Sequence, residues 1–451
     1  MRKSRTRAAR RRMAVLAPCA ALLAVACALP AGAASAELAV APVAGGAPAV
    51  TARAADPTPP GPPAATSSAL KTIDPAALRS AVERMTKELG VPGAIVLLRT
   101  PQGTFRTAVG TTEREKAVAP TTADHFRIAS NTKTMTAALI ELLAQDGRLR
   151  LTDPVSDYVT GVPNGEHITL AQLLTMRSGL YNYTSAPELA TSLDAEPGRA
   201  RTPREMLDIA FRRPPNFAPD ASYEYSNTNY ALLGLVAEKA GGRPLARQLR
   251  ERLFAPLGLA GTSLPGTRDV SLPAPFAHGY MYGGSSHALV DDPYPADVRA
   301  AGRSGKLAPL DYTHQNPSYA TAAGGVISTA DDLATWIRAL VTGKVLDPAH
   351  QPQWLDSPRA EDPAAPDGQK YGYGIAYQRF APHAAMYYHG GELPGYNSFM
   401  GYDPDNDVTL VIWTNLTLSL DGRTTAQALL PTVLDQIYTG LDLTSPKPPA
   451  G

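Results

Sequence analysis

The sequence predicts an α/β plus all-α protein, in which an antiparallel sheet flanked by helices carries an inserted helical subdomain. Residues 94–99 and 105–110 predict two strands joined by Pro101-Gln102-Gly103. Residues 150–360 predict mainly helices and loops, and strands return after Tyr371. Strands on both sides of a helical middle can form one sheet only if the two ends of the chain meet, so we expect a shared antiparallel sheet.

Local signals predict the individual elements in order. Asp74 can cap a helix that Gly90 ends, and a further helix begins at Ser130 and stops before Gly147. In the middle of the chain, apolar periodicity predicts helices at residues 169–176, 203–211, 229–240, 244–253 and 330–341. Towards the end of the chain, the pattern predicts strands at residues 385–389, 398–402 and 408–415, and then a helix at 424–438.

Residues 1–36 predict a signal peptide. Basic residues run as far as Arg12, an apolar run follows from Met13 to Leu29, and Ala34-Ser35-Ala36 offers a cleavage site. The apolar run is rich in alanine and interrupted by proline, so it is weaker than a bilayer-spanning helix. We therefore expect a secreted protein without a stable membrane span, exported by the general or the twin-arginine route.

Both cysteines, Cys19 and Cys27, fall in this leader, so the mature chain would have neither a disulfide nor a thiol site. Lipid attachment at Cys27 is a weaker alternative, because alanine stands three residues before it where leucine is usual. Removing the leader takes seven of the 42 basic residues and none of the 41 acidic residues, which leaves a net charge of −6. This acidic balance argues against nucleic acid as a partner.

The rest of the chain divides by composition. Residues 37–70 are rich in alanine and proline and predict a disordered linker, and residues 443–451 predict a tail. Residues 71–442 predict the folded domain. Within it, the α/β part would take residues 71–128 and 365–440, and the helical part residues 129–364.

Three short motifs predict the chemistry, and they are Ser130-Asn131-Thr132-Lys133, Tyr225-Ser226-Asn227 and His389-Gly390-Gly391. On a helix, residues three apart lie one turn apart on the same face, so Ser130 and Lys133 can touch. A serine hydroxyl is a poor nucleophile by itself, and a neighbouring amine gives its proton a place to go.

The conjunction of the motifs is specific, although each is weak alone. Ser68-Ala69-Leu70-Lys71 also matches S-x-x-K, in a proline-rich stretch where no rigid site is expected. In contrast, Y-x-N occurs only at Tyr225 and H-x-G only at His389. The chain lacks G-x-S-x-G and H-E-x-x-H, and it also lacks glycine-rich phosphate-binding motifs. We therefore expect an acyl-transferring serine site without a metal or cofactor.

With these motifs the chain resembles the penicillin-recognising serine hydrolases, in the branch of class C β-lactamases, secreted D-alanyl-D-alanine carboxypeptidases, D-aminopeptidases and related esterases. The resemblance covers residues 72–440. It extends to Phe126–Ser130, Ile168–Leu174, Ser178–Leu180, Ala323–Thr329, Asp332–Leu333 and Tyr371–Gly374. It implies the serine β-lactamase and DD-peptidase-like fold, with the site in the cleft between the two subdomains.

The resemblance also implies roles for the motif residues. Ser130 would attack a carbonyl and become acylated, and Lys133 would accept its proton. The pKa of Lys133 would be lowered by burial and by a positively charged His389. Tyr225 would pass the proton to the leaving group. His389, at the position of the family's lysine, would hydrogen-bond to Tyr225 and polarise it.

Further residues would bind the substrate. Asn227 would hold the lysine and donate to an amide carbonyl of the substrate. Gly390 and Gly391 would keep the strand open to the substrate backbone. The backbone N–H groups of Ser130 and Glu392 would form the oxyanion hole. The tyrosines at residues 371, 373, 387, 388 and 396 are better explained as half-buried strand positions than as cleft residues.

One departure from the family bears on the substrate. Members that hold a terminal carboxylate often have hydroxyl residues on both sides of the last motif glycine, and here these positions are Gly390 and Glu392. A Glu392 side chain in the cleft would repel a carboxylate and favour a neutral or cationic group. Arg379 is an alternative carboxylate anchor, although a solvated arginine is the simpler interpretation.

Several functions share this set of residues. The resemblance implies first a D-alanyl-D-alanine carboxypeptidase or a related D-amino-acid peptidase or amidase. The alternatives are a β-lactamase, an esterase of small esters, and a penicillin-binding or sensing protein that deacylates slowly. The expected partners are a small molecule or a peptidoglycan-like D-peptide, and β-lactams as further ligands, with the protein acting as a monomer.

Overall fold

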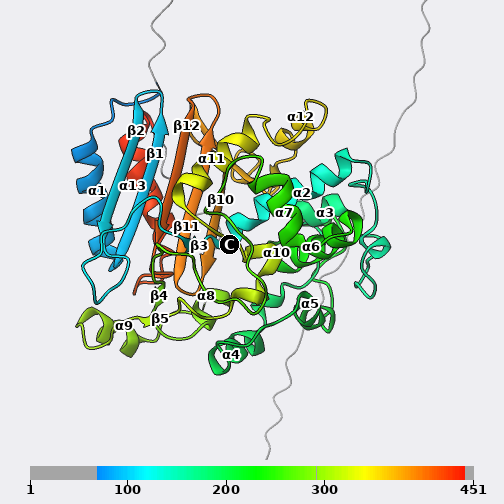
Figure 1. The fold of residues 1–451 in the computed structure, drawn as a ribbon, viewed down its shortest axis with the longest axis horizontal. Helices are drawn as coiled ribbons and strands as arrows, with labels where there is room; N and C mark the ends of the chain where they lie inside the picture. The colour runs from blue at the N-terminus through cyan, green and yellow to red at the C-terminus, as the bar shows by residue number, and fades with distance from the viewer. Residues whose placement is uncertain (1–68, 291, 442–451) are drawn as a thin grey trace, which may run out of the picture. The chain divides into compact units, whose positions relative to one another are not determined.

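The computed structural model describes residues 69–290 and 292–441. The predicted leader with both cysteines, residues 37–68 of the predicted linker and the predicted tail lie outside the described residues. The helices and strands are shown in Figure 1. Among the described helices, none is both long and apolar enough to cross a bilayer.

The predicted fold class is confirmed by an eight-stranded antiparallel sheet made from both ends of the described chain. Its strand order is β2-β1-β12-β11-β10-β9-β8-β7. The strands are β1 (Gly93–Thr100), β2 (Gly103–Gly110), β7 (Arg359–Ala360), β8 (Lys370–Tyr371), β9 (Ala376–Ala381), β10 (Ala384–Leu393), β11 (Tyr396–Asp403) and β12 (Val408–Thr414). Strand β1 pairs with β12 in a register that sets Ala94 opposite Thr414, so the predicted N-terminal hairpin joins the C-terminal strands.

Two helices at the ends of the domain cover one face of the sheet, and one helix covers the other. Helices α1 (Pro75–Leu89) and α13 (Thr425–Ile437) pack against each other and on the sheet, and α11 (Ala330–Val341) packs on β1, β11 and β12. Helix α1 begins where predicted, because the Asp74 side chain accepts hydrogen bonds from Ala76 N and Ala77 N. It ends at Gly90, whose φ of 70° lies in the left-handed region that favours glycine.

The inserted region consists mainly of helices and short turns. Its helices are α2 (Thr132–Gln145), α3 (Leu170–Leu174), α4 (Pro187–Ala195), α5 (Pro203–Phe211), α6 (Asn227–Gly241), α7 (Leu245–Leu249), α8 (Ser286–Leu289), α9 (Ala296–Arg303), α10 (Thr321–Gly324) and α12 (Gln351–Leu355). The short 3₁₀ turns are η1 (Ala129–Asn131), η2 (Val155–Asp157), η3 (Tyr183–Ser185) and η5 (Pro317–Tyr319), and η4 (Arg250–Phe254) is a π-helical segment that continues α7. Two small sheets pair β3 (Phe126–Arg127) with β6 (Ile327–Ser328), and β4 (Tyr280–Met281) with β5 (Leu310–Asp311).

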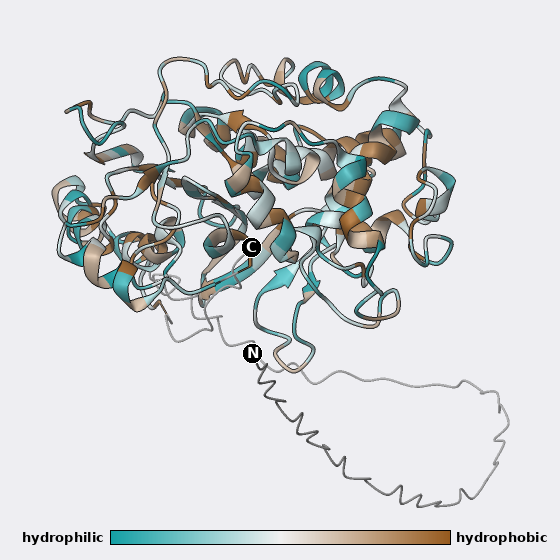
Figure 2. Cartoon of the chain, turned by 90° about the horizontal axis from the view of Figure 1, so that it is seen from below, coloured by the Kyte–Doolittle hydropathy of each residue, from teal (hydrophilic) through white to brown (hydrophobic). Residues whose placement is uncertain are grey.

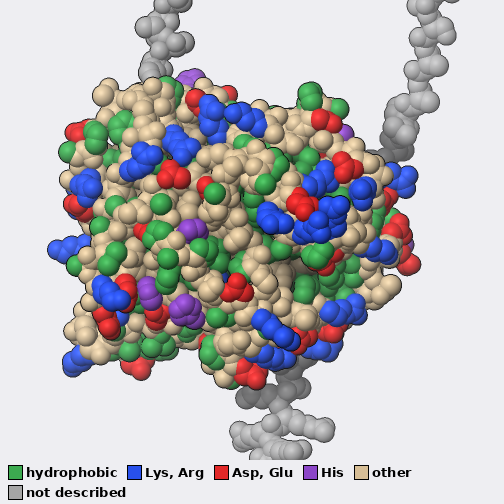
Figure 3. Space-filling model, in the orientation of Figure 1, with side chains coloured by type: hydrophobic (Ala, Val, Ile, Leu, Met, Phe, Trp, Pro, Cys, Tyr) green, Lys and Arg blue, Asp and Glu red, His purple; other side chains and the backbone are tan. Residues whose placement is uncertain are grey.

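A continuous hydrophobic core joins the sheet to the helical region. Ile95 of the sheet, Leu142 of α2 and Leu207 of α5 belong to the same cluster of buried side chains. Figure 2 shows hydrophobic residues mainly in interior strands and helices, and Figure 3 shows acidic and basic side chains interspersed over one face. Helix α2 is buried along nearly its whole length, from Thr132 to Leu143, so residues at its start are held rigidly.

Candidate active site

Ser130 lies in the short turn η1, which is held between the sheet and the start of α2. Ile128 N donates to Val326 O at 3.1 Å, and Val326 N donates to Thr132 Oγ1, also at 3.1 Å. Ala129 has a φ of 49°, a left-handed conformation that costs a residue with a side chain some strain. This backbone strain directly precedes Ser130, whose side chain is buried apart from a small exposed part.

Close packing of η1 on β10 explains the second glycine of the H-x-G motif. A Cβ at Gly391 would lie 2.3 Å from Ile128 O, so a larger residue would push η1 away from the strand. A Cβ at Gly390 would instead lie 2.8 Å from Nε2 of Gln427, on helix α13. The missing side chains therefore make room for protein atoms. Both glycines also line a small hollow beside Ser130, so their role towards a substrate backbone stays a prediction.

Lys133 is fully buried beneath Ser130 and has three polar partners. Its Nζ lies 2.8 Å from Ser130 Oγ, 2.7 Å from Asn227 Oδ1 and 2.8 Å from Ala323 O. Burial lowers the pKa of Lys133 well below its ordinary value, since no carboxylate accompanies the amine. The expected Lys133–Asn227 contact is present, and the Asn227 amide nitrogen donates to Thr184 Oγ1 at 2.9 Å.

The three partners suit a neutral amine. Asn227 Oδ1 and Ala323 O can only accept, so they take the two N–H groups of an uncharged Lys133. The nitrogen lone pair is then left for the hydroxyl of Ser130, at 2.8 Å. This arrangement would let Lys133 remove the serine proton.

Tyr225 adjoins Ser130 and remains an uncharged phenol. Its hydroxyl is buried, lacks a partner in close hydrogen-bond geometry within the described chain, and has the Ser130 hydroxyl as a polar neighbour. Burial raises the pKa of Tyr225 well above its ordinary value. Lys133 Nζ lies 4.8 Å from the centre of the tyrosine ring, where a protonated amine would be stabilised.

His389 differs from expectation in its charge and in its partners. Its Nδ1 lies 2.6 Å from Gly390 O, which can only accept, so Nδ1 carries the proton. Its Nε2 then accepts from the Tyr371 hydroxyl at 3.0 Å. Burial first, and then the neighbouring Lys133, lower the pKa of His389 to about 3.

Two predictions about His389 are therefore wrong. It is not a cation that lowers the pKa of Lys133, because burial drives both groups towards their neutral forms. It also makes no hydrogen bond to Tyr225 among the described contacts, and the centres of the two rings lie 6.3 Å apart. Tyr371, for which a half-buried strand position was the favoured interpretation, is its partner. The Tyr371–Gly374 match to the family was the signal in the sequence that could have identified it.

The register of β10 turns one backbone N–H group towards Ser130. Leu393 pairs with Tyr396 across a two-residue turn, and Glu392 pairs with Asn397. Hydrogen-bonded and non-hydrogen-bonded pairs alternate in an antiparallel ladder, and the pair next to such a turn is hydrogen-bonded. The N–H of Glu392 therefore points away from β11. This is the side on which the predicted oxyanion hole requires it, together with the N–H of Ser130.

Ser130 stands where two hollows meet. The larger hollow, about 230 Å³, is mainly polar and includes Glu224 and Glu392 in its lining. No lysine or arginine contributes to the lining formed by the described residues. Other lining side chains are those of Asn182, Thr184, Ser185, Asn227, Ala288 and Leu289.

The second hollow, about 60 Å³, is mainly apolar. Tyr223, Tyr371 and Tyr388 line it together with His389. Tyr371 and Tyr388 therefore line the site from their strands β8 and β10, which is the interpretation that the sequence favoured less. Arg379 lines neither hollow, is exposed on β9 and donates to Pro382 O at 2.9 Å, so the structure does not support it as a carboxylate anchor.

Comparisons with known proteins agree with this geometry. The family model described as Beta-lactamase matches residues 78–433. The protein PbpX of Bacillus subtilis (strain 168) is 24% identical over 351 residues, which are 77% of this chain and 75% of that protein. The D-stereospecific amidohydrolase of a Streptomyces species is 29% identical, with a TM-score of 0.67 over 80% of this chain and 98% of its own. The D-amino acid amidase of Ochrobactrum anthropi SV3, complexed with D-phenylalanine, is 27% identical, with a TM-score of 0.67 over 80% and 98%.

Proposed function

The chain belongs to the beta-lactamase family and is a serine hydrolase of that fold, and from this premise we propose that it hydrolyses amides and short peptides of D-amino acids that carry a free amino group. The observation that carries this proposal is the charge of the larger hollow beside Ser130. Glu224 and Glu392 are among its lining residues, the charge of Glu392 acts on the pKa of Tyr225, and the described lining contains no lysine, arginine or histidine that could pair with a substrate carboxylate.

The first half of the reaction would form an acyl-enzyme. The Ser130 oxygen attacks the amide carbon while its proton moves to the neutral Lys133 amine. The carbonyl oxygen gains negative charge, which the N–H groups of Ser130 and Glu392 would stabilise. Tyr225, next to Ser130 and in the lining of both hollows, would donate a proton to the leaving nitrogen as the C–N bond breaks. The proton held by Lys133 would then restore the tyrosine hydroxyl.

The second half would reverse these proton transfers with water in place of the amine. A water in the polar hollow attacks the ester carbon and transfers its proton towards Lys133. The Ser130 oxygen leaves with a proton, which restores the free enzyme. His389 would act here by position, because a neutral ring held by Tyr371 neither supplies nor removes the reacting proton.

Two comparisons support the choice of substrate. The Streptomyces neighbour is named a D-stereospecific amidohydrolase, and the Ochrobactrum anthropi neighbour a D-amino acid amidase. A free amino group beside the scissile amide would lie within a carboxylate-lined hollow. A substrate ending in D-Ala-D-Ala would bring its carboxylate there instead, without a basic partner in the described lining.

The proposal is tested by comparing kcat/KM for D-phenylalanine amide, N-acetyl-D-phenylalanine amide and a peptide that ends in D-Ala-D-Ala. We expect the free amine to be preferred over both comparison substrates by about tenfold or more, as one lost charge pair is worth about 1.4 kcal/mol or more. The isosteric Glu392→Gln variant should reduce the preference for the free amine and leave the N-acetylated substrate nearly unaffected. Faster cleavage of the D-Ala-D-Ala peptide, or an unchanged preference in Glu392→Gln, would refute the proposal.

A further inference from the structure

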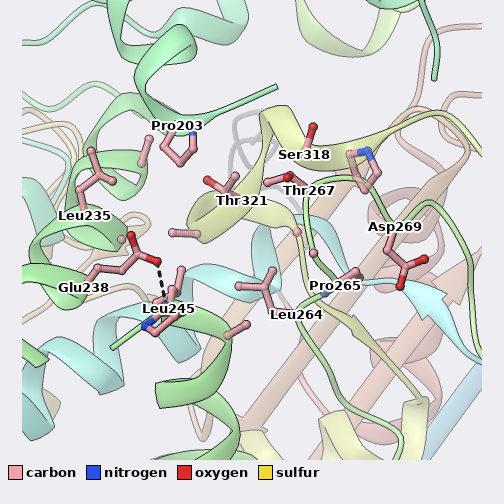
Figure 4. A pocket seen from close by; sticks show the side chains of 18 of the residues that line it. Pro203, Leu235, Glu238, Leu245, Leu264, Pro265, Thr267, Asp269, Ser318 and Thr321 are labelled. Atoms are coloured by element: carbon pink, nitrogen blue, oxygen red, sulfur yellow. Dashed lines mark hydrogen bonds between the residues drawn. The ribbon is translucent and has the colours of Figure 1, made fainter. Parts of the chain in front are cut away.

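A second cavity lies beside α10, separate from the two hollows at Ser130. Its volume is about 330 Å³, within the range of about 300–1,000 Å³ in which small-molecule sites fall. Helices α6, α7 and α10 and the segment 264–269 surround it. Most of its lining is apolar and includes Pro203, Leu235, Leu245, Leu264, Pro265 and Ala322, several of which are drawn in Figure 4.

Helix α10 and its flanking residues form a wall between this cavity and the catalytic hollow. The catalytic hollow is lined on this side by Ala320, Ala323 and Gly324. The cavity is lined by Thr321, Ala322 and Gly325. The wall also carries Ala323 O, which accepts from Lys133 Nζ at 2.8 Å. A displacement of this short helix would therefore move one of the three partners of the catalytic amine.

The backbone of the wall is strained where it faces the cavity. Thr321 has a φ of 28°, in the region that favours glycine. Two side-chain hydrogen bonds from α2 hold the wall, because Thr136 Oγ1 donates to Ala322 O and Lys133 Nζ to Ala323 O, both at 2.8 Å. Strain persists in a fold only while the surroundings hold it, so filling the cavity would change the conditions that maintain this conformation.

The charges in the lining indicate which ligand the cavity would accept. Glu238 and Asp269 are the charged residues of the described lining, which contains no lysine, arginine or histidine. Figure 4 shows them on opposite sides of the cavity, with apolar side chains between them. One oxygen of Glu238 accepts from Leu245 N at 2.9 Å, so the carboxylate is held at the wall. An apolar interior between two carboxylates complements a small organic cation.

We propose that this cavity is a second ligand site, which binds a small molecule with an ammonium group on an apolar body, and that its occupancy alters catalysis through α10. A ligand that prefers one arrangement of α10 shifts the equilibrium towards it. The contact of Ala323 O with Lys133 then transmits the shift to the amine that activates Ser130. The site does not depend on the proposed substrate, because it lies on the opposite side of this wall.

Binding of hexyltrimethylammonium, followed by calorimetry, tests the site, with hexanoate and 1-hexanol as anionic and neutral comparisons. Ala246→Phe places a ring into the cavity from α7. The double variant Glu238→Gln and Asp269→Asn removes both charges and keeps oxygen acceptors for Leu245 N and Ser271 N. Glu392→Gln is the control for binding in the catalytic hollow.

We expect saturable binding of the cation, at least tenfold weaker binding of hexanoate, and a loss of at least tenfold in affinity in each cavity variant. Glu392→Gln should bind the cation as the unaltered protein does. A saturating cation should change kcat at least twofold, and Ala246→Phe should abolish that change. Three results would overturn the site: undiminished binding in Ala246→Phe, equal binding of hexanoate, or loss of binding in Glu392→Gln. An unchanged kcat at saturation would overturn the coupling through α10.

Discussion

At the scale of single residues, the reactivity of Ser130 depends on one buried amine. Lys133 Nζ has two partners that only accept and one hydroxyl, all within 2.8 Å. A buried ammonium is costly unless a carboxylate accompanies it, and none does so here. The neutral amine satisfies all three contacts, since Ser130 can donate to its lone pair. The same burial keeps His389 neutral, so the site operates without a permanent cation.

Replacing this amine should remove most of the activity. We expect Lys133→Met to lower kcat/KM by about 10²–10⁴, because the variant retains the shape of the side chain and loses the proton acceptor. Steady-state kinetics with D-phenylalanine amide measures the effect. The matched control is Lys71→Met, which removes the lysine of the other S-x-x-K match, a partly exposed residue paired with Asp435 at 3.1 Å. If Lys133→Met were as active as the Lys71→Met control, Lys133 would not be the base.

Motif spacing could predict which residues meet at this scale, but not their protonation. Ser130 and Lys133 are one helical turn apart, so their contact follows from local geometry. The state of His389 depends on Tyr371, 18 residues away on another strand, and on burial by the whole fold. Neither dependence can be deduced from the H-x-G motif, which is why the positive charge expected there was wrong.

At the scale of elements, the site depends on how closely the turn η1 approaches strand β10. Gly391 lies against Ile128 O, and a Cβ there would be 2.3 Å from that oxygen. The neighbouring Gly390 faces the end of the flexible Gln427 side chain, which can move. Gly391 thus faces a backbone atom that cannot move aside easily, and Gly390 faces the end of a side chain that can.

Alanine at these two positions should therefore give different results. We expect Gly391→Ala to lower kcat/KM by about 100-fold, because displacing the serine by a fraction of an ångström spoils its alignment. It should also cost about 1–3 kcal/mol of unfolding free energy through overpacking. Gly390→Ala should remain within about threefold of the original activity. Kinetics and thermal unfolding of both variants measure this, and equal effects would show that the η1–β10 contact does not control the site.

Long amphipathic elements could be predicted from sequence, whereas several of the shortest ones could not. Helix α1, the hairpin of β1 and β2, and helix α11 lie at or within a residue or two of their predicted bounds. Helix α10 has four residues, too few for any periodicity, and depends on a left-handed Thr321. It was not predicted, although it supplies a partner of Lys133.

At the scale of the whole molecule, one core connects the sheet to the helices and encloses an acid that the mechanism does not use. Glu141 lies on α2, is 1% exposed, and neither carboxylate oxygen has a hydrogen-bond partner within the described chain. Burial raises the pKa of Glu141 to about 7 from the ordinary 4.5, and His350 partly opposes the shift.

This buried acid should make stability depend on pH. The folded state favours the protonated form of Glu141. The contribution of this group to the free energy of unfolding is therefore fully present below pH 4.5 and is lost as the pH rises through about 7. We expect the difference in unfolding free energy between Glu141→Gln and the original protein to shift by about 2–3 kcal/mol in favour of the variant as the pH rises from 5 to 8. Chemical denaturation at both pH values measures the gain, with the exposed Glu166→Gln as control. If the variant and the original protein differed in unfolding free energy by the same amount at both pH values, Glu141 would not titrate in this range.

The overall architecture could be predicted because strand patterns occur at both ends of the chain, and only a shared sheet pairs them. The extent of the sheet could not. Strands β7 and β8 have two residues each and no alternation of their own, so they join the sheet only because β9 lies beside β8.

The most direct test of the central claim is the intact mass of the protein after exposure to a fluorophosphonate, which forms a stable bond to an activated serine. We expect one adduct on the original protein, located at Ser130 by peptide mapping. Ser130→Ala should give no adduct and Lys133→Met a strongly slowed reaction, while Lys71→Met should react as the original does. An adduct that persists in Ser130→Ala, or an active protein that never acquires one, would contradict Ser130 as the nucleophile.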